Sequence, residues 1–71
     1  MEVTVKIRFN ASQERFERYG NNRYLLYLPF SLDADAQHVI IALLSKYLGM
    51  PARRISFLAM SPAKDWVFSL S

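Results

Sequence analysis

Residues able to act as acids, bases or nucleophiles are few in this chain. It contains one histidine, His38, and no cysteine, which excludes a thiolate nucleophile and a disulfide framework. His38 has no serine or aspartate partner at the spacing of a known catalytic motif, so we expect it at the surface. Asp33 and Asp35 form a close carboxylate pair, but N-capping and the dipole of a predicted helix account for both. We therefore expect no catalytic residue, no metal ion and no cofactor, and a protein that is not an enzyme.

Basic residues accompanied by aromatic ones suggest binding chemistry instead. The 71 residues include nine Lys+Arg against six Asp+Glu, a net charge of +3 that permits an acidic partner without requiring one. Cationic side chains near an exposed aromatic ring can hold phosphates and stack a base. The candidate binding residues for RNA or another polyanion are Lys6, Arg8, Tyr27, Arg53, Arg54 and Lys64.

Each of these candidates also has an ordinary structural explanation. Arg53 and Arg54 precede a predicted strand, where a charged pair is usually only solvated. Tyr27 and Trp66 lie at strand spacing, which is more often typical of a core than of a stacking surface. A second basic cluster, near residues 15–23, is interleaved with Glu14 and Glu17, so we expect local ion pairs there.

The elements that must position these residues follow from the hydrophobic pattern. Apolar residues alternate with polar ones over residues 2–9, and strands are also predicted over 23–30, 55–60 and 66–70. Residues 10–22 are polar and contain a Gly-Asn-Asn turn signal, so we expect an ordered loop. The predicted fold is a two-layer α/β domain, β-β-α-β-β, with one main helix packed on one face of a mixed four-stranded sheet.

The helix is the most clearly marked element. Asp33 is the expected N-cap, and Gly49 followed by Pro51 marks the C-terminal end. Apolar residues between them recur at helical spacing, at Ala36, Val39, Ile40, Leu43, Leu44, Tyr47 and Leu48.

A single helix covers only one face of such a sheet, so the opposite face is left open. Its predicted residues mix basic and apolar side chains: Lys6, Arg8, Leu25, Tyr27, Leu58 and Val67. One hypothesis is a non-catalytic module that binds RNA or another polyanion there. The alternative is a module for protein–protein interaction or self-association, through the apolar residues of that face or through an edge strand.

The sequence also carries expectations about location. The N-terminal residues alternate and are charged, which is not typical of a signal peptide. The longest apolar run, over residues 39–44, is far too short to span a membrane, so we expect no membrane contact. Because the chain has no cysteine, we expect a cytoplasmic protein.

Residues 11–70 share an order of motifs with a known group of proteins. An Ala-Ser pair follows the first strand, and a strand ending near a proline leads to Asp33, Ala36 and Gln37. A helix and a Leu-Gly-Met-Pro turn then precede Arg53, Arg54 and Ile55. In these features the chain resembles the YggU-like family of small uncharacterised proteins.

The resemblance implies one domain over residues 1–71 with a two-layer α/β fold, and little chemistry, because that family has no established activity. The chain departs from the family at three positions: Ala34 stands for a glycine, Gln37 for an asparagine and Met60 for a glycine.

Overall fold

The computed structural model describes residues 1–31 and 36–71 of the chain. Along these residues it contains five strands, an α-helix and a short 3₁₀ helix. Their bounds are β1 Glu2–Arg8, β2 Arg15–Gly20, β3 Arg23–Tyr27, α1 Ala36–Leu48, η1 Ala52–Arg54, β4 Ile55–Met60 and β5 Trp66–Leu70. The candidate carboxylates Asp33 and Asp35, and the substituted family position Ala34, lie outside the described residues.

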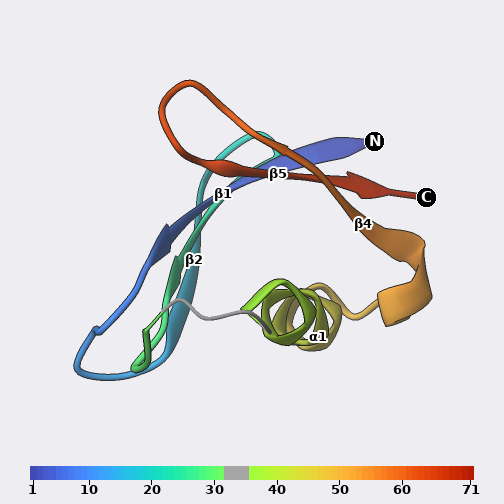
Figure 1. Cartoon of the computed structure of the whole chain (residues 1–71). Helices are drawn as coiled ribbons and strands as arrows, with labels where there is room; N and C mark the ends of the chain where they lie inside the picture. The colour runs from blue at the N-terminus through green and yellow to red at the C-terminus, as the bar shows by residue number, and fades with distance from the viewer. Residues whose placement is uncertain (32–35) are drawn as a thin grey trace.

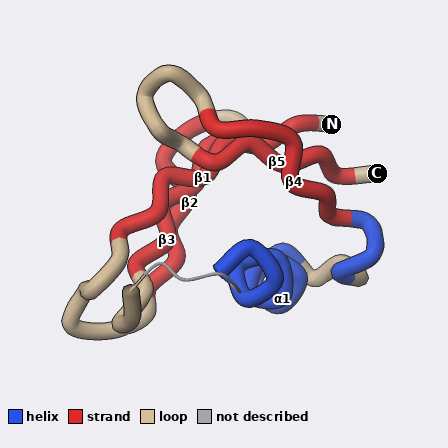
Figure 2. The backbone as a smooth tube through the Cα atoms, in the orientation of Figure 1, coloured by secondary structure: helices blue, strands red, loops and turns tan. Residues whose placement is uncertain are grey.

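The strands form one mixed sheet in the order β2-β3-β1-β5-β4. The two central pairs differ in direction, because β1 runs parallel to β3 and antiparallel to β5. The outer pairs, β2 with β3 and β4 with β5, are antiparallel hairpins. Figure 1 shows the sheet curving around α1, which lies on one side of it, and Figure 2 shows the same two layers as helix and strand. The predicted two-layer fold with one helix on a mixed sheet is therefore confirmed.

The predicted number of strands is wrong, because the sheet has five strands rather than four. The segment expected to be a loop contains β2, which forms a hairpin with β3 across Asn21 and Asn22. Asn22 adopts the left-handed conformation, φ 56°, which asparagine tolerates better than most residues. β2 is an edge strand with one inward apolar residue, Phe16, so its alternation is too weak to be seen in the sequence.

The hydrophobic core lies between the inner face of the sheet and α1. Its buried members come from β1, β3, the loop after β3, α1, β4 and β5: Val3, Val5, Leu26, Leu28, Ala36, Ile40, Leu44, Ile55, Phe68 and Leu70. α1 ends where predicted, at a Gly49 with φ 70°, whose N–H donates to the Ser45 carbonyl at 3.0 Å. An aromatic stack extends the core to the β2 edge, because the Phe16 ring lies 4.6 Å from Tyr47 of α1 and 5.2 Å from Tyr24 of β3.

The register of the strands defines the opposite face of the sheet. Lys6 pairs with Leu25, Arg8 with Tyr27 and Thr4 with Val67. Val3 and Val5, the residues between these positions on β1, are buried in the core, so Thr4, Lys6 and Arg8 point to the other side. We call the side of the sheet that carries Lys6, Arg8, Leu25, Tyr27 and Val67 the outer face.

Candidate functional site

Three strands place a tyrosine between two arginines at one end of the outer face. Arg8 of β1 pairs with Tyr27 of β3, and Tyr27 pairs with Arg15 of β2. Residues paired across neighbouring strands lie side by side on the same face. Both arginines are exposed and the tyrosine is partly buried, so a ligand on this row would meet an aromatic ring flanked by two cations.

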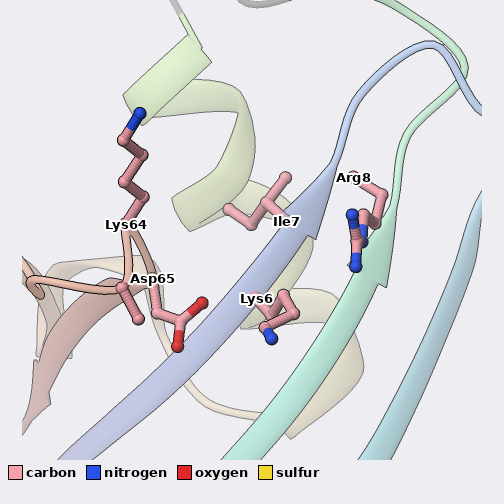
Figure 3. A pocket seen from close by; sticks show the side chains of 6 residues that line it. Lys6, Ile7, Arg8, Lys64 and Asp65 are labelled. Carbon is pink, nitrogen blue, oxygen red and sulfur yellow. The ribbon is translucent and has the colours of Figure 1, made fainter.

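A hollow of about 270 Å³ adjoins this row on the β5 side. It is lined by Lys6, Ile7, Arg8, Ala63, Lys64 and Asp65. The hollow forms because the pairing of β1 with β5 ends at Val5, so the last three residues of β1 run on beside the turn that joins β4 to β5. Figure 3 shows the Asp65 carboxylate pointing from that turn towards β1, whereas the Lys64 side chain extends away from Lys6.

The end of β1 also directs backbone groups at this hollow. Thr4 and Arg8 direct their backbone groups at the β3 side, because the Thr4 N–H donates to the Asn22 carbonyl and the Arg8 carbonyl accepts from Leu28. Backbone groups of successive strand residues alternate in direction, so the Ile7 N–H and carbonyl point to the opposite side, beyond the last β1–β5 pair. A backbone N–H at such a place is a donor for an anionic oxygen.

The turn that carries Lys64 is held by its own hydrogen bonds. The Lys64 N–H donates to the Ser61 carbonyl at 2.8 Å, and the Ser61 N–H donates to the Asp65 carbonyl at 2.8 Å. The Asp65 N–H donates to the Ser61 hydroxyl at 3.1 Å. Lys64 itself has φ 65°, a left-handed conformation that costs a residue with a side chain about 1–2 kcal/mol. The backbone of the turn is therefore fixed, and the lysine side chain that extends from it is exposed.

A second hollow of about 240 Å³ lies on the β2 side of Tyr27. It is lined by Ala11, Ser12, Gln13, Arg15 and Tyr27. The loop that forms its wall is fixed by backbone bonds, since the N–H groups of residues 10 and 11 donate to the carbonyls of residues 30 and 28 at 3.0 and 2.9 Å. We call the surface formed by Lys6, Arg8, Arg15, Tyr27 and Lys64, with the two hollows, the Arg8 surface.

The charges on the Arg8 surface are unevenly neutralised. Arg15 forms an ion pair with Glu17 at 2.6 Å, which confirms the ion pairing expected in that cluster. In the part of the chain that the structure describes, neither Lys6 nor Arg8 has an acidic partner at ion-pair distance, and Asp65 is the one acidic residue that lines their hollow. Among the described residues, Asp65 is thus the one negative charge beside these two cations.

Arg53 and Arg54 lie at the other end of the sheet. They belong to η1, immediately before β4, and β4 begins beside the end of β5, where Ile55 pairs with Leu70. The Arg54 Nε donates to the backbone carbonyl of Ser71. The structure thus brings together Lys6, Arg8, Tyr27 and Lys64 of the candidate binding residues, and separates Arg53 and Arg54 from them.

Arg15 is the member of the Arg8 surface that the sequence did not place there. The sequence shows it next to Glu14 and Glu17, which suggests a local ion pair and nothing more. Its position beside Tyr27 depends on β2 pairing with β3 in register, and β2 was not recognisable as a strand. The Gly-Asn-Asn sequence, which begins four residues after Phe16, is the weak indication of a hairpin that the sequence offers.

The remaining candidates for chemistry are isolated. His38 is exposed on α1. Within residues 1–31 and 36–71 there is no group of three or more His, Asp or Glu side chains placed to hold a metal ion. α1, the longest helix in those residues, is too short to cross a membrane.

One side chain has a perturbed ionisation. The Tyr47 hydroxyl donates a hydrogen bond to the Glu14 carboxylate, and chiefly through this bond the pKa of Tyr47 is raised above 10.0. Burial and the negative charge of Glu14 act in the same direction. The bond ties α1 to the loop that walls the second hollow.

Comparison with known proteins found no match: no family model, no curated protein and no solved structure is similar to the chain. The resemblance to the YggU-like family stays a prediction from the sequence.

Proposed function

We propose that the protein is a non-catalytic binding module that holds single-stranded RNA on the Arg8 surface. The observation that carries the proposal is the pairing of Arg8 with Tyr27, which sets an aromatic ring beside cations that have no acidic partner among the described residues. Sequence-tolerant binders of single strands combine these two features, since bases stack on the ring while phosphates meet the cations. A cytoplasmic location and membership of the YggU-like family belong to the same proposal.

The residues have distinct roles in this proposal. Lys6, Arg8 and Lys64 contact phosphates in the first hollow, together with the Ile7 N–H. Tyr27 stacks a base in the neighbouring position. The Asp65 carboxylate repels a phosphate in this hollow, so the affinity is modest. The same repulsion favours one orientation of the RNA backbone.

Three phosphate contacts set the expected dependence on salt. For single strands, the logarithm of the association constant falls with the logarithm of the salt concentration by about 0.7 for each contact, so the slope here is about −2. Between about 50 and 200 mM salt the affinity should therefore fall about 20-fold.

The experiment is fluorescence anisotropy of a labelled single-stranded RNA of about ten nucleotides, titrated with the full chain at both salt concentrations. Arg8→Gln should weaken binding at least about tenfold, because it removes a charged hydrogen-bond donor. It should also reduce the slope by about 0.7. Arg53→Gln makes the same change of charge at the other end of the sheet, and should leave both quantities unchanged.

Substitutions at Tyr27 distinguish the binding of RNA from the binding of other polyanions. Tyr27→Phe keeps the ring and should bind RNA as well as the unaltered protein, whereas Tyr27→Leu should lose about 1–3 kcal/mol. A polyanion without bases, such as polyphosphate, should bind weakly and respond equally to both substitutions. If RNA does not bind at low salt, or if the leucine variant binds as tightly as the phenylalanine variant, this function is wrong.

A further inference from the structure

The β4 edge of the sheet is apolar and unusually open. β4 is the last strand of the sheet, so one side of its backbone pairs with β5 and the other lies at the edge. Its six residues, Ile55–Met60, include no charged side chain. Two of them are large apolar residues with about half of their surface exposed, Leu58 at 48% and Met60 at 47%.

The other edge of the same sheet is built differently. β2 has the sequence RFERYG, and three of its six residues are charged. Natural sheets protect edge strands with charges, because unpaired backbone groups otherwise recruit another strand. The β2 edge carries charges, whereas β4, which is equally long, carries none and has only a bulge at Leu58 as protection.

We propose that β4 pairs with β4 of a second copy of this chain, in an antiparallel dimer related by a two-fold axis. An edge strand offers a row of backbone donors and acceptors, and the partner that satisfies them is another strand. A two-fold pairing requires a strand that is complementary to itself. β4 meets this requirement, because it has no charged residue and two copies of it therefore place no like charges opposite each other.

Charged residues lie beyond both ends of the paired strands. In an antiparallel arrangement the start of β4 meets the end of the partner's β4, so Arg53 and Arg54 approach the turn that carries Lys64 and Asp65. This turn carries one cation and one anion, and the Asp65 carboxylate points towards β1 (Figure 3), so the turn offers the two arginines no net attraction across the interface. Lys6, Arg8, Arg15 and Tyr27 of the Arg8 surface lie on β1, β2 and β3, which β5 separates from the β4 edge, so the dimer leaves these four residues accessible.

The expected dimer is weak. β4 carries a bulge at Leu58, since Phe57 pairs with Phe68 and Ala59 with Val67. A bulge increases local twist and shortens the stretch that pairs regularly, which reduces the contact area. We expect a dissociation constant between about 10 µM and about 1 mM.

Sedimentation equilibrium of the full chain tests the proposal, over protein concentrations from about 5 µM to about 1 mM. The weight-average mass should rise from 8.3 kDa towards twice that value. Leu58→Lys introduces the protection that β4 lacks and should hold the protein at 8.3 kDa throughout. Met60→Lys is a second variant with the same expectation, and circular dichroism establishes that each variant is folded.

Tyr19→Lys is the matched control, because Tyr19 is 50% exposed on the opposite edge strand and should leave the dimer intact. A mass of 8.3 kDa for the unaltered protein at every concentration would overturn the proposal. So would a dimer that persists in folded Leu58→Lys and Met60→Lys, because its interface would then lie elsewhere.

Discussion

Lys64 combines an unfavourable backbone with a useful charge. Its left-handed conformation is one that glycine adopts without a steric penalty. In a lysine the β-carbon comes too close to the following carbonyl oxygen, which costs free energy. Lys64→Gly should remove the charge and relieve the backbone together.

We expect Lys64→Gly to keep the free energy of unfolding within about 1 kcal/mol of the original, because relief of the left-handed conformation offsets the added entropy of glycine in the unfolded chain. Its RNA affinity should fall and its salt slope should decrease by about 0.7. Chemical denaturation and anisotropy measure the two quantities. A large loss of stability with unchanged binding would assign Lys64 a purely structural role.

Tyr47 gives the stability a measurable dependence on pH. The hydrogen bond to Glu14 raises the pKa of Tyr47 in the folded protein, so the folded chain holds the phenol proton more tightly than the unfolded chain. This contribution is fully present below the ordinary value of 10.0 and is lost as the pH rises from there through the raised pKa. Stability should therefore fall over this alkaline range.

Tyr47→Phe and Glu14→Gln should each flatten this alkaline decline, since each removes one side of the bond. Urea denaturation at a series of pH values measures it. Parallel curves for the unaltered protein and Tyr47→Phe would show that the bond does not contribute. In either variant the Phe16–Tyr47 ring stack should persist, because residue 47 keeps its ring.

At the scale of elements, the end of α1 depends on one glycine. Gly49 has φ 70°, and a β-carbon placed there meets no atom within 4 Å, so the cost of a side chain comes from the backbone alone. Gly49→Ala should lower the free energy of unfolding by about 1–2 kcal/mol. Gly20→Ala is the matched control, because Gly20 is not left-handed and its nearest neighbour is 3.5 Å away, an ordinary contact. Thermal denaturation of both variants compares them, and equal losses would contradict this explanation.

The helix and four of the strands could be predicted because their signals are local. The end of α1 is marked by Gly49 and Pro51, and β4 and β5 have the bounds expected from their apolar residues. β2 could not be predicted, because an edge strand needs only one buried side chain and Phe16 alone does not establish a period. Its existence depends on the hairpin with β3, which is an interaction between two segments.

At the scale of the whole molecule, the site depends on the order of the strands. Lys6, Arg8, Tyr27 and Lys64 were predicted as individual binding residues, but their proximity follows from the pairing of β1 with β3 and from the start of β5 opposite Val5, before the end of β1. The same order places Arg15 beside Tyr27 on the Arg8 surface, and it places Arg53 and Arg54 at the opposite end of the sheet. Residue types could be read from the sequence, whereas strand order arises from long-range pairing that no local pattern encodes.

The most direct test of the account is to map the RNA contact on the protein. Two-dimensional NMR spectra of isotope-labelled protein, titrated with a single-stranded RNA, report the change at each backbone amide. We predict that the largest shifts occur at Lys6, Ile7, Arg8, Tyr27 and Lys64, with little change at Arg53 and Arg54. Shifts centred on Arg53 and Arg54, or spread evenly over all basic residues, would contradict the assignment of binding to the Arg8 surface.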